Sequence, residues 1–396
     1  MTTIYVDNAA TTKTSRTAID AMLPYFDKIY GNPSSLHSVG QAAADALRKA
    51  REEAAEVLGC EPSEITFTSG GSEADNQALV SAAAIGARKG KKHIISTAFE
   101  HHAVLHTLKK LEKEGFEVTL LDVHENGMVS AQQVADAIRE DTCLVTVMYA
   151  NNEIGSIQPI AEIGAVCREK GVIFHTDAVQ AVGHIHINVK EENIDMLSLS
   201  AHKFHGPKGV GLLYARRGIR LTNIIEGGAQ ERGKRAGTEN IPGIVGMVAA
   251  LKEANANIDA NAAKVSALRD RLIAGLEKIP HSALNGDRTR RLPGNVSFCF
   301  EGIEGESLLL LLDRKGIAAS SGSACTSGSL DPSHVLLAIG LPHEVAHGSL
   351  RLSVGEYNTD EEMAYIVDNV RQVVAYLRSI SPVWDELETG ARPHLI

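Results

Sequence analysis

Two residues with reactive side chains, Lys203 and Cys325, lie in surroundings that suit chemistry better than packing. Lys203 follows a run of alternating Leu and Ser residues and precedes the turn at Gly206 and Pro207. A lysine in such a place can lower its pKa and form a Schiff base with a carbonyl compound. Cys325 lies among Ser, Gly, Ala and Thr, where a thiol is accessible and can ionise and attack. Each residue alone is more often an ordinary surface lysine or an inert thiol, but together they predict a carbonyl cofactor and a sulfur nucleophile.

The other four cysteines have different surroundings from Cys325. Cys143 and Cys299 lie in apolar stretches typical of buried strands, Cys167 lies in a helical segment and Cys60 in a turn. The total is odd, the residues are scattered and no CxxC motif occurs. This pattern predicts free thiols in a reducing compartment rather than a disulfide framework.

Polar residues follow several predicted strands, at the edge where open α/β sheets bind ligands. Asp177 comes directly after the strand at 172–176, where a carboxylate can hold a pyridine-type ring nitrogen protonated. A helix N-cap is an equally good interpretation of Asp177. Gln180 and Asn152 lie near strand ends and suit a substrate carboxylate or a phenolic oxygen, or simply a turn.

A phosphate site is predicted between the strand at 64–68 and the helix at 73–87. Gly71 and Ser72 lie at this junction, where main-chain N–H groups and the start of a helix can bind an anion. The segment matches neither a Walker loop nor a GxGxxG fingerprint, and a plain turn is about equally compatible. Ser200 and His202, which flank Lys203, offer further hydrogen-bond donors to a phosphate.

Histidines and one arginine complete the candidate residues. His101 follows the strand at 93–97 and can lie flat on an aromatic cofactor and exchange protons with a substrate. His102 and His106 are four residues apart, but no carboxylate or thiol completes a metal site, so we predict none. Arg351 lies between apolar residues and can bind a carboxylate through two hydrogen bonds; a structural ion pair is the alternative role.

The elements that must position these residues alternate between apolar strands and amphipathic helices as far as about residue 255. This pattern predicts an α/β fold with a mostly parallel sheet covered on both faces. The predicted strands are 64–68, 93–97, 117–121, 142–149, 172–176, 196–200 and 209–214, and the helices are 73–87, 103–114, 131–139 and 160–170.

After residue 255 the pattern changes to that of a smaller α+β lobe. It comprises helices at 256–278, 307–315 and 359–379 and strands at 295–300, 317–320 and 350–354. We therefore predict a large domain at 13–255 and a small domain at 1–12 and 256–396, which carries the Cys325 loop. A chain of 396 residues is long enough for two such lobes.

Charge and hydropathy exclude other classes of protein. The net charge is −10, from 39 basic and 49 acidic residues, which argues against nucleic acid or anionic lipid as a direct partner. No basic region followed by an apolar stretch opens the sequence, and no run of 18 apolar residues occurs. We expect a cytoplasmic protein without a membrane segment.

Taken together and in order, these segments resemble a cysteine desulfurase of the NifS/IscS type, in the class V aminotransferase family of fold-type I enzymes dependent on pyridoxal 5'-phosphate (PLP). The resemblance runs nearly end to end, and the Ser-Ser-Gly-Ser-Ala-Cys setting of Cys325 is typical of this branch. The matching segments are 5–12, 31–35, 69–73, 100–101, 151–155, 177–180, 200–203, 235–238 and 320–327.

The resemblance implies a role for each candidate residue. Lys203 would hold PLP covalently and move the Cα proton, Asp177 would pair with the pyridine nitrogen, and Gln180 would bind the phenolic oxygen. His101 would stack on the ring and transfer protons. Cys325 would attack the substrate sulfur. The residues implied to hold the phosphate or the substrate carboxylate are Gly71, Ser72, Ser200, His202 and, from the other subunit of a homodimer, Thr238 for the phosphate, and Asn152 and Arg351 for the carboxylate.

The implied reaction converts L-cysteine to L-alanine and leaves sulfur on Cys325 as a persulfide. An acceptor such as an iron–sulfur scaffold or a tRNA-thiolation enzyme would then take the sulfur. Two alternatives stay open, a selenocysteine lyase and a PLP aminotransferase of small amino acids, which would not need Cys325. Relatives often have Ala and Thr where this chain has Gly71 and Ser72, and residues 387–396 do not match the tail of some relatives.

Overall fold

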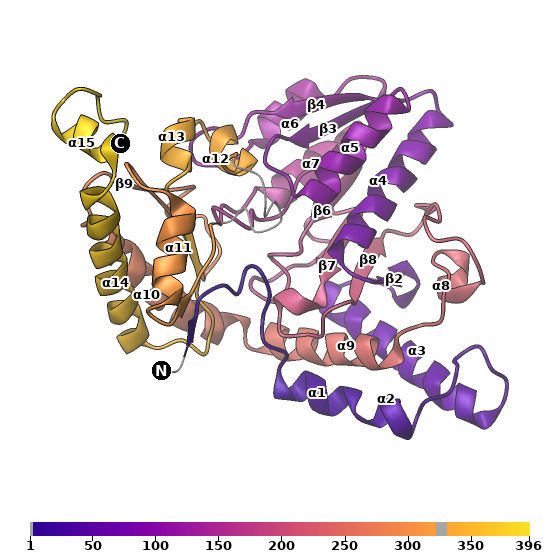
Figure 1. The fold of residues 1–396 in the computed structure, drawn as a ribbon. Helices are drawn as coiled ribbons and strands as arrows, with labels where there is room; N and C mark the ends of the chain where they lie inside the picture. Colours follow the sequence, from indigo (N-terminus) through magenta and orange to yellow (C-terminus); the bar gives the residue numbers. More distant parts are fainter. Residues whose placement is uncertain (1–2, 322–330) are drawn as a thin grey trace.

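The computed structural model describes residues 3–321 and 331–396, and Figure 1 shows their arrangement. The larger part is built on a seven-stranded sheet with the order β2-β8-β7-β6-β5-β3-β4. Its strands are β2 (Ile65–Thr68), β3 (His93–Thr97), β4 (Glu117–Leu121), β5 (Thr142–Thr146), β6 (Ile173–Asp177), β7 (Met196–Ser200) and β8 (Gly211–Ala215). β8 runs antiparallel to both of its neighbours, and the other pairs are parallel. The prediction of a mostly parallel sheet is confirmed.

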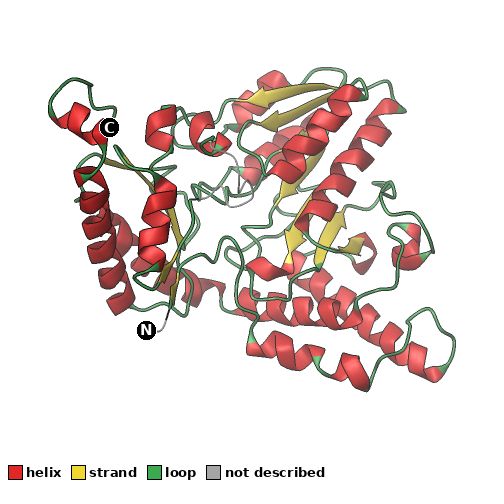
Figure 2. Ribbon diagram, in the orientation of Figure 1, coloured by secondary structure: helices red, strands yellow, loops and turns green. Residues whose placement is uncertain are grey.

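Helices cover the sheet, as Figure 2 shows. The helices of this part are α1 (Arg16–Met22), α2 (Pro24–Asp27), α3 (Ser38–Leu58), α4 (Gly71–Ala87), α5 (His102–Lys113), α6 (Ala131–Ala137), α7 (Ile160–Lys170), α8 (Gln230–Gly233) and α9 (Ile241–Ala256). Of these, α1 and α2 pack on α9 rather than on the sheet. α4 packs against β5, β7 and β8. Its small residues permit this approach, because a Cβ added to Gly86 would lie 2.4 Å from the Cβ of Cys143. A helix that is buried on most sides must be apolar all round, and α4 is rich in alanine for this reason.

The C-terminal part forms a second, smaller core around the antiparallel sheet β12-β10-β9. Its strands are β9 (Ser282–Leu284), β10 (Asn295–Phe300) and β12 (Ser349–Ser353), and its helices are α10 (Ile258–Leu276), α11 (Gly305–Asp313) and α14 (Asp360–Ser379). The N-terminal strand β1 (Ile4–Tyr5) pairs with β11 (Ile317–Ala318) in parallel. We call these elements the small lobe, and the seven-stranded sheet with its helices the large lobe.

Two short helices that follow the Cys325 segment in the sequence pack on the large lobe. They are α12 (His334–Ala338) and α13 (His343–Ala346), and their buried residues Val335, Leu336 and Val345 belong to the hydrophobic cluster of the large lobe. The remaining helix, α15 (Pro382–Glu388), follows α14. The predicted domain boundaries, 13–255 against 1–12 and 256–396, concern folding units and stay a prediction.

Some elements differ from the sequence-based expectation. The helix expected at 256–278 is α10, which begins at Ile258, because Asn257 separates it from the preceding helix α9. The expected strand at 142–149 ends as β5 at Thr146, although main-chain bonds from Val147 and Tyr149 still reach β6. In the described part of the chain, no helix is long and apolar enough to cross a membrane.

Candidate active site

The candidate residues meet at the carboxyl edge of the seven-stranded sheet. Asp177 is the last residue of β6, and Ser200 is the last residue of β7. His101 caps the start of α5, and Gly71 opens α4. Because the carboxyl ends of neighbouring parallel strands open on one edge, side chains from distant segments are brought to the same place.

Asp177 lies at the centre of this edge with two titratable neighbours. Its side chain is buried, with the residue 4% exposed, and Oδ1 accepts a hydrogen bond of 2.9 Å from the Val179 amide. Ligand atoms of Asp75, His101 and Asp177 all lie within 4.8 Å of one another. Burial raises the pKa of Asp177, and the positive charges of His101 and Lys203 offset only part of this effect.

Asp75 is a site residue that the sequence interpretation missed. It is buried in α4, and its Oδ1 has no hydrogen-bond partner among the described residues. Burial and the neighbouring Asp177 carboxylate raise the pKa of Asp75 well above its usual range. An acidic residue one turn into an alanine-rich helix was the signal that could have found it, since carboxylates are almost never fully buried without a partner or a role.

The junction before α4 leaves room that only glycine allows. A Cβ added to Gly71 would lie 2.6 Å from Cγ2 of Val179 and 3.6 Å from Cβ of Ser200. The structure therefore brings Gly71 and Ser200 together at the start of a long helix, where main-chain N–H groups attract an anion. Ser72, the next residue, is exposed. The arrangement fits a bound phosphate group.

His202 borders the same region. Its Nδ1 lies 3.1 Å from Oγ1 of Thr11. Burial, together with the charges of Lys203 and Lys208, lowers the pKa of His202 to about 4. The imidazole is therefore neutral at physiological pH and has one N–H to donate.

Lys203 reaches the site from the short helix that follows β7. Its ammonium Nζ donates to the main-chain oxygens of Ala9, at 2.5 Å, and Ala10, at 2.9 Å. The amide of Gln180 also donates to the Ala9 oxygen, at 2.9 Å. An N-terminal segment that the residue-by-residue interpretation did not use thus lies beside the predicted Schiff-base lysine.

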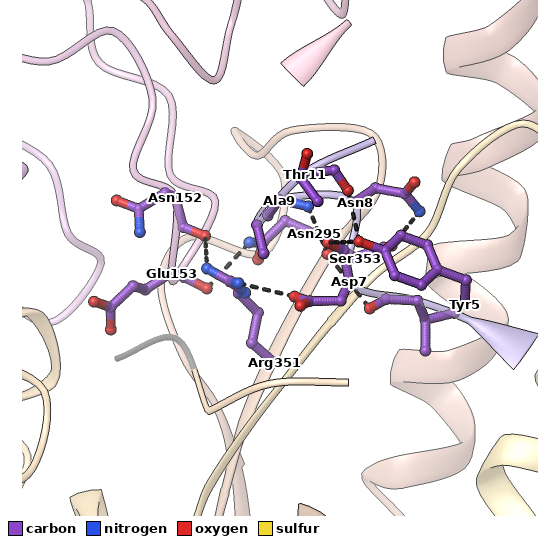
Figure 3. Close-up of polar contacts among 12 residues, drawn as sticks. Tyr5, Asp7, Asn8, Ala9, Thr11, Asn152, Glu153, Asn295, Arg351 and Ser353 are labelled. Carbon is purple, nitrogen blue, oxygen red and sulfur yellow. Dashed lines mark hydrogen bonds and ion pairs between the residues drawn. The ribbon is translucent and has the colours of Figure 1, made fainter. Parts of the chain in front are cut away.

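Arg351 enters the site from β12 of the small lobe. The residue is only 2% exposed; Nη1 donates to the main-chain oxygen of Asn152 and Nη2 pairs with Oδ1 of Asp7, each at 3.0 Å. Figure 3 shows both contacts. The Nε–H of Arg351 has no partner among the described residues. Arg351 and Asn152 are adjacent as expected, but the contact uses the Asn152 main chain, and Asp7 was not foreseen.

The two lobes also meet beside Glu153. Its carboxylate accepts a hydrogen bond from the Ser333 hydroxyl, and its main-chain oxygen accepts from the Asn295 amide at 3.0 Å. His334 lies 3.0 Å from the Glu100 oxygen through Nε2. These contacts hold the start of α12, a few residues after the Cys325 segment, against the large lobe.

The histidine pair that raised a metal alternative is a ring stack. His102 and His106 have ring centroids 5.1 Å apart, and His334 lies 4.6 Å from His102. Burial and the neighbouring His334 and His106 lower the pKa of His102 to about 4. The His102 imidazole is therefore neutral at physiological pH.

Two predicted residues cannot be counted among this cluster. Cys325 lies outside the described residues. Thr238 is exposed on the loop between α8 and α9, and its predicted role was assigned to the partner subunit of a dimer. Both assignments stay predictions.

Arg351→Lys is expected to raise the KM for L-cysteine, the substrate that the resemblance implies, roughly tenfold or more, with a smaller effect on kcat. Lysine keeps the positive charge but loses the planar fork that can contact a carboxylate while also holding Asp7 and the Asn152 oxygen. Steady-state kinetics across a range of L-cysteine concentrations would measure the change. An unchanged KM would show that Arg351 is only a structural ion pair.

Comparisons with known proteins give a consistent result. A family model described as aminotransferase class-V matches residues 4–366. A protein named cysteine desulfurase IscS from Clostridium botulinum is 55% identical over 386 residues, which cover 97% of each chain. A solved NifS-like protein has a TM-score of 0.89 and 38% identity and covers 95% of this chain and all of that one. A structure titled SspA in complex with cysteine has a TM-score of 0.79 and 37% identity, and the match covers 90% of this chain and 99% of that one.

Proposed function

This chain belongs to the aminotransferase class-V family and is a cysteine desulfurase of the NifS/IscS type, and we propose that it converts L-cysteine to L-alanine with PLP and stores the sulfur on Cys325. The observation that carries this proposal is that Asp177, His101 and Lys203 meet beside the predicted phosphate site, where Gly71 and Ser200 come together at the start of α4. Arg351 from the small lobe completes it on the substrate side.

The described residues suit PLP in their chemistry. When bound, this cofactor withdraws electrons from the Cα of an attached amino acid. Asp177 provides a buried carboxylate for the pyridine nitrogen, and Gln180 provides an amide for the phenolic oxygen. The amides at the start of α4, with Ser200 and His202, would hold the phosphate. His101, which caps α5 beside Asp177, would lie on the ring.

The remaining residues act on the substrate. Arg351 and Asn152 would hold the carboxylate of L-cysteine, so that its Cα faces Lys203, which removes and returns a proton there. The Cys325 thiolate would attack the substrate sulfur. The S–S bond forms as the C–S bond breaks, the C–S electron pair stays on carbon, and that carbon takes up a proton to give L-alanine.

The persulfide on Cys325 would then pass its outer sulfur to the thiolate of an acceptor protein. The name IscS of the Clostridium relative supports an iron–sulfur scaffold as this acceptor, and a tRNA-thiolation enzyme is the second candidate. The four described cysteines are all free, which supports action in a reducing cytoplasm.

A homodimer is also part of this proposal. Thr238 is exposed, and large apolar side chains are exposed along the segment from the end of α1 to the start of α3. These side chains are Leu23, Phe26, Tyr30 and Leu36. Exposed apolar residues that cluster in one segment often mark a protein interface. A second copy would cover them and bring Thr238 to the partner's phosphate site.

The function is tested by product balance. Purified, PLP-loaded protein with a thiol reductant is expected to give L-alanine and sulfide in equal amounts from L-cysteine, with no added 2-oxo acid. A reaction that requires a 2-oxo acid and produces no sulfide would instead identify an aminotransferase. A parallel assay with L-selenocysteine compares the rates of alanine formation from the two substrates and tests the selenocysteine lyase alternative.

A further inference from the structure

His205 lies two residues after Lys203 and makes two hydrogen bonds through its ring. Nε2 lies 2.9 Å from Oε1 of Glu356, and Nδ1 lies 2.8 Å from the main-chain oxygen of Lys13. A carboxylate and a carbonyl can only accept hydrogen bonds, so both ring nitrogens must carry a proton. His205 is therefore an imidazolium cation in this fold. The side chains of His205 and Glu356 are 13% and 26% exposed, which limits the screening of this pair by solvent.

The His205–Glu356 pair joins the two lobes. His205 belongs to the segment that carries Lys203, and Glu356 follows β12, which carries Arg351. Both line a cavity of about 240 Å³, together with Asn257 at the break between α9 and α10. Because side chains do not fill the space between the lobes here, the ion pair is a direct link across a gap.

A second route of contacts connects the same two segments. The main-chain oxygen of Ala9 accepts a hydrogen bond from Lys203, and the Ala9 amide donates one to Oγ of Ser353 at 2.9 Å. Asp7 pairs with Arg351, as Figure 3 shows. At the other end of the segment, Oγ1 of Thr12 accepts from the His205 amide at 2.8 Å. Lys203 and Arg351 thus lie in a closed ring of contacts, and the His205–Glu356 pair closes it.

We propose that His205, through Glu356, is a positioning residue that fixes the separation of Lys203 and Arg351. The inference rests on the proposed function, because it assigns Arg351 to the carboxylate of L-cysteine and Lys203 to its Cα. Loss of the pair would let the small lobe shift relative to Lys203. The substrate would then be held less tightly, although the residues that hold the cofactor lie in the large lobe and would be unaffected.

The charges around His205 determine how the pair depends on pH. Burial lowers the pKa of His205, but the hydrogen bond and charge of Glu356 and the Lys13 carbonyl raise it more, with a further contribution from Glu253, and the net shift is upward. Burial raises the pKa of Glu356, but His205 and His184 lower it below its ordinary value. The edge of the Tyr357 ring also faces His205, at 5.6 Å between centroids.

The sign of the pH effect follows from these shifts. The pair is complete below the ordinary histidine pKa of about 6.5 and is lost as the pH rises through the higher value in the folded protein. Glu356 stays ionised across this range. The KM of the wild type should therefore rise as the pH passes the pKa of His205. This rise should be absent from a variant that has a neutral residue at position 205.

The test compares His205→Asn, Glu356→Gln and the double variant. His205 has a φ of 64°, and asparagine tolerates this left-handed backbone while removing the charge. His124→Asn is a matched control, because His124 also has a positive φ, 53°, and lies 3.6 Å from a carboxylate, that of Asp122. It is exposed, and its ring contacts Gln133 and Asp122 rather than a candidate residue.

Each single variant is expected to raise the KM for L-cysteine roughly fivefold with kcat nearly unchanged, and the double variant should be no worse than either single one. The difference in KM between wild type and His205→Asn should shrink as the pH rises. The visible absorbance of bound PLP should be the same in every variant.

An unchanged KM with a lowered melting temperature would overturn the proposal and leave the pair as a structural tie. Equal KM changes in His124→Asn would also overturn it. If the wild type releases no alanine from L-cysteine, the proposed function itself fails, which is a separate result.

Discussion

Cys325→Ser is expected to lower the rate of L-alanine formation from L-cysteine roughly a thousandfold or more, while PLP binding stays intact. A serine hydroxyl is a weak nucleophile toward sulfur and cannot hold a persulfide. Alanine measured by chromatography, beside the visible absorbance of the bound cofactor, would separate loss of chemistry from loss of the cofactor.

The four described cysteines cannot substitute for Cys325. Burial raises the thiol pKa to about 11 for Cys143 and to about 12 for Cys60, Cys167 and Cys299. These thiols stay protonated at neutral pH and are poor nucleophiles. Cys60→Ser is the matched control and should keep full activity. Normal alanine formation by Cys325→Ser would remove this residue from the mechanism.

Lys203→Ala is expected to have the second large effect, a loss of alanine formation on the order of ten-thousandfold. The change removes both the amine that would hold PLP and the base that would move the Cα proton. Treatment with borohydride, followed by peptide mass analysis, should locate reduced cofactor on Lys203 in the wild type and none in the variant.

The control for Lys203 is a nearby lysine of the same loop. Lys208 is exposed, five residues further along the chain, and Lys208→Ala should retain cofactor and activity. Reduced cofactor found on Lys208, or turnover by Lys203→Ala close to that of the wild type, would show that the lysine was wrongly assigned.

The sheet could be predicted because most of its strands are short runs rich in apolar residues and threonine or serine, bounded by polar turns. β2, β3, β5, β7 and β8 bury every residue, and such runs stand out from the polar turns around them. Candidate residues at strand ends follow from the same pattern, since parallel strands open on one edge. Asp177 was predicted in this way, whereas Ser200 was predicted from its place beside Lys203.

Contacts between distant segments could not be predicted from local pattern. Arg351 and Asp7 are 344 positions apart, and Ser333 and Glu153 are 180 apart, so no periodicity connects them. These contacts depend on how the two lobes pack.

Some helices were missed although the sequence carried a signal. α3 buries Ala43, Ala50, Ala54 and Leu58 at helical spacing, but small alanine side chains make a weak apolar face. α9 is apolar on most sides, and Pro242 near its start with three nearby glycine or asparagine residues resembles a turn. Proline in the first turn is in fact favourable for a helix.

The most direct test of the central claim is to locate the sulfur on the protein. PLP-loaded protein would be given L-cysteine without reductant, the remaining thiols blocked, and the peptides analysed by mass spectrometry. We expect the peptide containing Cys325 to gain the mass of one sulfur atom, and reductant to remove it with release of sulfide. Sulfur on Cys60 or another thiol instead, or alanine formed with no persulfide on any peptide, would contradict the account.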